Sequence, residues 1–260
     1  MPHNPDSAIL WSSLGAYLEE LAESGIEGFP AGDMINLPRP VARSADSGST
    51  RQAPAAKPEE DTSGHHDSLE KIRKDLGNCQ RCKLGKTRKQ LVFGAGNPRA
   101  RLVFVGEGPD TDEDLTGQPF VAESGQVFNR IISAMGLQRE EIYICTAVKC
   151  HPPKGHDVDS DEIGACAPYL LRQIQVIGPE AIVALGTFAA QALLGTKEPI
   201  TKLRGKFHDF HGIPLMPTLH PSHLLSKKGD SGPFWDVWED MVQVLQLLKL
   251  PVADKSRKSG

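Results

Sequence analysis

A loop rich in glycine, proline and acidic residues constrains the fold of this chain most. It follows residues 101–105, a short apolar run rich in β-forming residues that predicts a buried strand. It precedes residues 126–135, whose apolar side chains recur at helical spacing. Because ligands of open α/β sheets bind at the carboxyl ends of strands, Glu107 is expected at a ligand site, one residue past the strand. The alternative is an ordinary surface loop whose acids cap the next helix.

Strands and helices are expected to alternate along the rest of the chain. Strands are predicted at residues 142–148, 181–185 and 213–219, and a turn around residues 203–207 is expected to join two short strands. Helices are predicted at residues 161–177, 188–194 and 234–248. This alternation predicts a mostly parallel sheet with helices on both faces.

Composition divides the chain into four parts. Residues 1–27 contain an amphipathic helix that is expected to dock on a protein partner or on the main domain, and residues 28–67 form a linker rich in proline and small polar residues. Residues 68–250 form the globular domain, and residues 251–260 a disordered tail. No run of 18 apolar residues and no signal peptide is present, so we expect a cytoplasmic protein.

The distribution of charge says more than the formal net charge of −4. Seven basic residues and no acidic residue lie between Cys79 and Gly106: Arg81, Lys83, Lys86, Arg88, Lys89, Arg99 and Arg101. Such a run is typical of a solvated face, and its functional interpretation is an edge that contacts phosphates.

Four of the five cysteines suggest a metal site. Cys79 and Cys82 form a CxxC pair, whereas Cys150 and Cys166 are separated by 15 residues. In a cytosolic chain this pattern favours a metal or a cluster over disulfides. Zinc and a [4Fe–4S] cluster both accept four thiolates, and the wide second pair favours the cluster. Cys145 lies inside a predicted strand and is expected in the core.

Several motifs, taken in this order, resemble those of the iron–sulfur (family 4) uracil-DNA glycosylases. They are the four cysteines, Gly106-Glu107-Gly108-Pro109 with Glu113-Asp114, Gly117-x-Pro119-Phe120, Val148-Lys149-Cys150 followed by Pro152-Pro153, and His220-Pro221-Ser222. The resemblance covers residues 69–250. It implies a uracil-DNA glycosylase-like three-layer α/β/α sandwich around a short, mostly parallel sheet, and a [4Fe–4S] cluster held by Cys79, Cys82, Cys150 and Cys166.

The resemblance also implies a reaction, the hydrolysis of the N-glycosidic bond between uracil and deoxyribose in DNA by a monomeric enzyme. The base must leave the stack, because its sugar bond is unreachable inside a duplex. Phe120 is then expected to stack on the base, and the backbone of Gly106 and Gly108 to line the pocket. His220 would donate a hydrogen bond to the charge that develops on uracil O2, and Glu107 would orient water and stabilise the sugar cation.

Two positions depart from the family's pattern. Thr146 stands where the family usually has an asparagine that reads the uracil edge, and Asp110 stands where it usually has glycine. The alternative function is therefore an iron–sulfur DNA-binding module with weak or altered base specificity, and a further one is excision of another deaminated base. Leu224 and Leu225, after His220, would either wedge into the gap left by the flipped base or simply pack.

Overall fold

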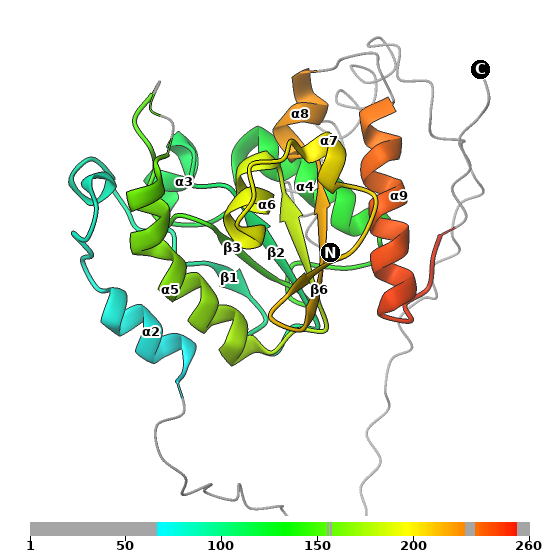
Figure 1. The fold of residues 1–260 in the computed structure, drawn as a ribbon, viewed down its shortest axis with the longest axis horizontal. Helices are drawn as coiled ribbons and strands as arrows, with labels where there is room; N and C mark the ends of the chain where they lie inside the picture. The colour runs from blue at the N-terminus through cyan, green and yellow to red at the C-terminus, as the bar shows by residue number, and fades with distance from the viewer. Residues whose placement is uncertain (1–66, 155, 157, 227–231, 254–260) are drawn as a thin grey trace, which may run out of the picture. The chain divides into compact units, whose positions relative to one another are not determined.

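A computed structural model describes residues 67–154, 156, 158–226 and 232–253 (Figure 1). The expected N-terminal helix at residues 1–27 lies outside these residues, as do nearly all of the linker at 28–67 and most of the tail at 251–260. No helix in the described ranges combines the length and hydrophobicity needed to cross a membrane.

The sheet has six strands in the order β1-β3-β2-β4-β6-β5. Its four central strands are parallel, and the two edge strands run antiparallel to their neighbours. The strands are β1 Ala95–Gly96, β2 Leu102–Gly106, β3 Tyr143–Thr146, β4 Ala181–Leu185, β5 His208–Phe210 and β6 Ile213–Thr218. Strands β2, β3 and β4 are buried along their whole length, which explains why their sequences are continuous apolar runs rather than alternating ones.

Helices cover both faces of the sheet, so the predicted three-layer α/β/α fold is confirmed (Figure 1). Helices α4 and α9 pack on one face, around Phe104 and Met216. Helices α5 and α6 pack on the other, around Val105 and Ile182, and α2 packs on the outside of α5. The helices are α2 Leu69–Leu76, α3 Thr111–Thr116, α4 Ala122–Ala134, α5 Ser160–Ile177, α6 Thr187–Leu194, α7 Ile200–Leu203, α8 Pro221–Ser226 and α9 Gly232–Leu247, and a short 3₁₀ helix, η1, spans Lys83–Lys86.

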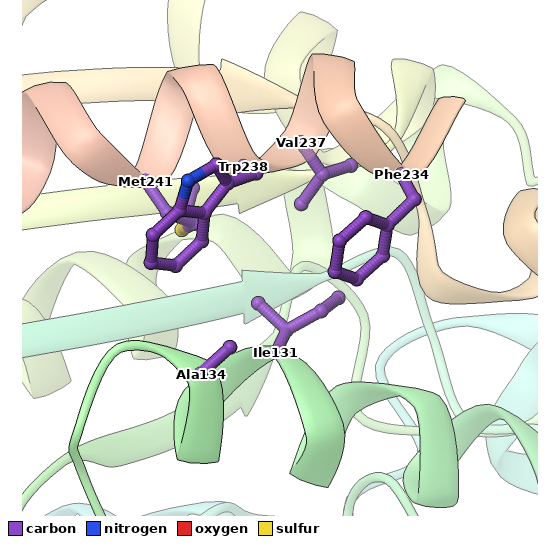
Figure 2. A pocket seen from close by; sticks show the side chains of 6 residues that line it. All are labelled: Ile131, Ala134, Phe234, Val237, Trp238 and Met241. Carbon is purple, nitrogen blue, oxygen red and sulfur yellow. The ribbon is translucent and has the colours of Figure 1, made fainter. Parts of the chain in front are cut away.

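Helices α4 and α9 face each other across a small void. Figure 2 shows Ile131 and Ala134 of α4 facing four side chains of α9. The volume of the void between them is about 10 Å³. The α9 side chains are Phe234, Val237, Trp238 and Met241. The void is wholly apolar and hardly larger than a water molecule, so it is a packing defect of the core and not a ligand site.

The prediction that a turn around residues 203–207 joins two short strands is wrong. Helix α7 ends at Leu203, and the turn that joins two short strands lies instead at His211–Gly212, between β5 and β6. Both turn residues have positive φ, 51° and 84°, as a two-residue hairpin loop of this twist requires. A four-residue helix such as α7 is too short for its periodicity to be recognised in the sequence.

The loop that follows β2 contains more helix than its composition predicts. Helix α3 begins after Asp110, whose carboxylate accepts a hydrogen bond from the amide of Glu113 at 2.9 Å, while the Glu113 side chain accepts one from the Asp110 amide at 2.8 Å. The acids of the loop therefore do cap a helix, as the alternative interpretation held. Helix α4 begins at Ala122, four residues before the predicted start.

Candidate active site

The carboxyl ends of the parallel strands bring the predicted site residues to one edge of the sheet. Gly106 ends β2, Thr146 ends β3, and the two are paired in register. Gly186 directly follows β4, and His220 comes two residues after the end of β6. Residues more than 100 positions apart in the sequence therefore meet at the edge where α/β proteins bind their ligands.

Glu107 and His220 both lie against Gly186. A Cβ atom placed on Gly186 would lie 2.3 Å from Oε1 of Glu107 and 3.1 Å from Cβ of His220. Gly186 also has a φ of 96°, which L side chains rarely adopt. Glycine at this position therefore allows the two predicted catalytic residues to come close together.

Helix α6 holds the Glu107 carboxylate at its N terminus. Oε1 of Glu107 accepts a hydrogen bond from the amide of Phe188 at 3.0 Å. Burial raises the pKa of Glu107, and the hydrogen bond from Phe188 partly opposes this rise. The result is a half-buried carboxylate that is fixed in place and ionised above its raised pKa.

The imidazole of His220 is neutral and its proton can be assigned. Burial lowers the pKa of His220 to about 4. Its Nδ1 accepts a hydrogen bond from the amide of Ser222 at 3.2 Å and lies 2.7 Å from the Ser222 hydroxyl. Because a backbone amide can only donate, Nδ1 carries no proton, and the proton of the neutral ring lies on Nε2. Nε2 is thus the donor that His220 offers to a ligand.

Phe120 lies beside His220, in the core between the sheet and helices α4 and α9, here called the main core. Its ring stacks on Phe128 with centroids 4.7 Å apart, and its centroid lies 5.8 Å from that of His220. A Cβ on Gly106 would come within 2.9 Å of two Phe120 ring atoms, so the bare backbone of Gly106 approaches the ring. Phe120 is 3% exposed, and it combines the expected site position with the packing role of a core aromatic.

Thr146 has a buried hydroxyl with no partner. The residue is 1% exposed, and its Oγ1 forms no hydrogen bond with any described residue. Its Cγ2 would lie 3.5 Å from a Cβ on Gly106, which places Thr146 beside the Gly106 backbone. A buried polar group without a partner is costly, and at a ligand site it is typical of a group reserved for the ligand. Gly108, the other predicted pocket glycine, lies against Val148.

Leu224 and Leu225 lie on helix α8 and pack against the main core, both partly buried. This arrangement favours the packing interpretation of the two leucines over the wedge.

The four predicted cluster ligands come from three segments. Cys79 and Cys82 precede η1, Cys150 follows β3, and Cys166 lies within α5. Cys82, Cys150 and Cys166 pack around Leu84 and Val148, whereas Cys79 packs against the cluster formed by Ile72, Leu76, Phe93 and Tyr169. No three cysteine sulfurs within the described ranges lie within 4.8 Å of one another. A single zinc ion would hold its sulfurs ~3.8 Å apart, given Zn–S bonds of about 2.3 Å, so the arrangement is wider than a zinc site.

Two arginines contact these cysteines, and no pattern in the sequence indicates their roles. Nη1 of Arg88 lies 3.4 Å from Sγ of Cys150 and donates to the carbonyl of Cys79 at 2.7 Å. Arg81 reaches Sγ of Cys79 at 3.5 Å. The positive charge of the two arginines therefore lies beside a donor set that carries negative charge when ionised. Lys149 is fully buried and donates to the carbonyl of Thr146 at 2.8 Å, and burial lowers its pKa.

A different group of side chains does converge closely. The donor atoms of His156, Asp159 and Glu162 lie within 4.8 Å of one another. Asp159 and Glu162 cap helix α5 reciprocally, and Lys83 donates to Asp159 at 2.6 Å. These partners satisfy the carboxylates, and the trio is a helix cap.

The basic run from Arg81 to Arg101 does not form one edge. Arg101 precedes β2 at the opposite end of the sheet and pairs with Glu180 at 2.5 Å. Lys89 lies near the site, because its amide donates to Asp114 of α3. Only the first part of the run therefore lies on the side of Glu107, and the interpretation as an edge that contacts phosphates remains a prediction for that part alone.

Comparisons with known proteins find one matching family model and several similar relatives. The model of the uracil DNA glycosylase superfamily matches residues 93–242, which include all six strands and Glu107, Phe120, Thr146 and His220. The type-4 uracil-DNA glycosylase of Saccharolobus solfataricus is 42% identical over 168 residues, 61% of this chain and 78% of the relative. That of Thermotoga maritima is 41% identical over 164 residues, 62% and 85% of the two chains. That of Archaeoglobus fulgidus is 36% identical over 167 residues, 61% and 84%.

Proposed function

Because the chain belongs to the type-4 uracil-DNA glycosylases of the uracil DNA glycosylase superfamily, we propose that it excises uracil from DNA. It hydrolyses the N-glycosidic bond and leaves an abasic site. The observation that carries this proposal is that Glu107 and His220 both lie against Gly186, at the carboxyl edge of the sheet. Similarity to relatives that are named as glycosylases also favours an enzyme over a DNA-binding module.

The base is received between the loop that follows β2 and the end of β3. A uracil flipped out of the duplex would meet the ring of Phe120, the backbone of Gly106 and the hydroxyl of Thr146. The Thr146 hydroxyl can donate or accept one hydrogen bond to the edge of the base, which would satisfy a group that otherwise has no partner.

His220 stabilises the leaving base. As the glycosidic bond breaks, its electron pair moves to uracil and negative charge grows on O2. A neutral imidazole with its proton on Nε2 donates to this oxygen without giving up the proton. A donor fixed in advance towards the developing charge accelerates the reaction because no solvent must reorganise.

Glu107 acts on the sugar. Positive charge grows on the deoxyribose as the base leaves, and an ionised carboxylate stabilises it. The free oxygen of the carboxylate can also accept a proton from the attacking water, because only Oε1 is hydrogen-bonded to Phe188. The water oxygen then forms the new bond to the anomeric carbon.

The same proposal includes a [4Fe–4S] cluster held by Cys79, Cys82, Cys150 and Cys166. The donor set fits: four thiols from three segments, three of them packed together, with Arg81 and Arg88 beside them to balance their negative charge. When bound, the cluster supplies cross-links between the segment before η1, the loop after β3 and helix α5. Since Cys150 follows Thr146 by four residues, these cross-links would also brace the base pocket.

The proposal is tested with an oligonucleotide that contains one uracil, incubated with the protein and then treated with hot alkali to cleave abasic sites. We expect cleavage at the uracil position and none in a matched oligonucleotide with thymine at that position. Intact uracil DNA at excess protein, with DNA binding detected by gel shift, would contradict the proposal and favour the binding module.

A further inference from the structure

The backbone that carries Phe120 has an unusual conformation. Phe120 and Ala122 both have a φ of 53°, in the left-handed region that residues other than glycine seldom adopt. Gly125 approaches the Phe120 carbonyl so closely that a Cβ on Gly125 would lie 2.1 Å from its oxygen. Such a conformation persists only where the surrounding structure holds it, and it is typical of functional sites.

Glu113 holds the amide side of Phe120. One carboxylate oxygen, Oε1, accepts a hydrogen bond from the amide of Phe120, and the other accepts one from the amide of Asp110 at 2.8 Å. Glu113 is 4% exposed, and its own helix, α3, lies within the loop that follows β2. The carboxylate thus ties Phe120 to the segment that begins three residues after Glu107.

Arg139 holds the carbonyl side of the same residue. Its guanidinium donates to the carbonyl of Phe120, to that of Pro119 at 3.1 Å and to Oδ1 of Asn129 at 2.7 Å. It also lies 5.5 Å from the ring centroid of Phe128, on which Phe120 stacks. Arg139 therefore fixes both the backbone of Phe120 and the ring beneath it.

We propose that Glu113 and Arg139 are positioning residues for base recognition, which together hold the ring of Phe120 at the angle that a flipped base requires. This inference rests on the proposed function. No hydrogen bond or ion pair of the described structure joins either residue to Glu107 or His220. Both act through Phe120, since a stacked base is held for attack only if the ring beneath it is fixed.

The chain provides a matched control for Glu113. Asp114 is the next residue of α3, is also 4% exposed, and also accepts backbone hydrogen bonds, from the amides of Lys89 and Gln90. Within the described structure no hydrogen bond joins Asp114 to Phe120. Asp114→Asn and Glu113→Gln therefore replace the same kind of buried carboxyl group in the same helix, and only Glu113→Gln loosens Phe120.

The test is a double-mutant cycle measured by single-turnover excision of uracil from DNA with excess full-length protein. Glu113→Gln and Arg139→Gln are each made in the wild type and in Phe120→Leu, which keeps an apolar side chain but removes the flat ring. We expect each to lower the rate constant roughly 10- to 100-fold in the wild type and less than about twofold in Phe120→Leu. Asp114→Asn should change the rate less than about twofold in both backgrounds.

The dependence on protein concentration separates positioning from a loss of folding. With protein in excess, a partly unfolded variant reaches the wild-type rate constant once its folded fraction saturates the DNA, whereas a misplaced ring lowers the rate constant at every protein concentration. Equal losses in the two backgrounds, or a loss that disappears as the protein concentration is raised, would overturn the positioning role; Arg139→Gln decides the matter if Glu113→Gln does not fold. A wild type that excises no uracil would overturn the proposed function itself, and this inference with it.

Discussion

The amide nitrogen of Phe188 lies 3.0 Å from Oε1 of Glu107, so the N terminus of helix α6 fixes a carboxylate beside the loop that receives the base. Burial raises the pKa of this carboxylate despite the hydrogen bond. A helix N terminus stabilises the ionised form and orients it, so Glu107 is ready to act on a cation without further rearrangement.

The first prediction concerns the acid side of the pH profile. If Glu107 must be ionised, the single-turnover rate falls as the pH drops through its raised pKa, since the neutral carboxyl group no longer stabilises the sugar cation. Glu107→Gln should be slow at every pH and lack this limb. The exposed Glu123→Gln serves as the control and should keep it. An unchanged acid limb in Glu107→Gln would assign the titration to another group.

The second prediction concerns stability and His220. Its pKa is about 4 in the folded protein and 6.5 as the ordinary value. Between these values the unfolded chain binds more protons, so His220 makes the free energy of unfolding increase as the pH rises from 4 to 6.5. His220→Asn should flatten this increase in urea titrations at pH 5.5 and 7.5.

The control for this prediction is His211→Asn, because His211 is exposed and asparagine tolerates its positive φ. It should leave the pH dependence as in the wild type. An identical increase in His220→Asn would show that His220 is not protected from protonation by folding.

The third prediction concerns Thr146, whose unpartnered hydroxyl offers one hydrogen bond where an asparagine offers a donor and an acceptor. Thr146→Asn should raise the excision rate on uracil and sharpen its preference over hypoxanthine, xanthine and cytosine. Thr146→Val, which keeps the shape but lacks the hydroxyl, should slow excision. If Thr146→Asn is slower than the wild type on uracil, the pocket is built around threonine.

The fourth prediction concerns the cluster. Protein purified without air should be brown and contain about four irons per chain, and Cys82→Ser should lose the colour. Arg88→Gln should retain less iron after exposure to a chelator, because Arg88 connects Cys150 to the carbonyl of Cys79. Lys86→Gln, an exposed neighbour, should retain iron as the wild type does. One zinc per chain and no iron would contradict the cluster.

The sequence predicts the sheet because its central strands are buried on both faces. Such strands must be continuous apolar runs, and the run at Ala181–Leu185 therefore has the predicted bounds. Once the strand ends are located, Glu107 and His220 follow as residues of one edge. Helix α7 and the hairpin turn at His211–Gly212 were missed because single turns depend on local backbone geometry, not on periodicity.

The residues that hold the site residues in place could not be predicted from the sequence in the same way. Arg139 acts on a carbonyl 19 residues earlier in the chain, and backbone groups carry no sequence signal. In the sequence Glu113 is recognisable only as part of a motif, although its carboxylate binds the amide of Phe120. Arg88 is one of seven basic residues in a run, yet it contacts Cys150. Tertiary packing decides which of several residues of the same charge contacts a buried group, and the sequence alone does not show it.

We propose that Glu107 and His220 catalyse the excision of uracil. It is tested most directly by the single-turnover rate constant and the DNA affinity of Glu107→Gln and His220→Ala, measured on the same uracil oligonucleotide. We predict that each variant lowers the rate constant about 10²- to 10³-fold and leaves the affinity within about twofold of the wild type, because neither side chain is needed to bind the phosphate backbone. Wild-type rate constants in both variants would contradict the account and place the active site elsewhere.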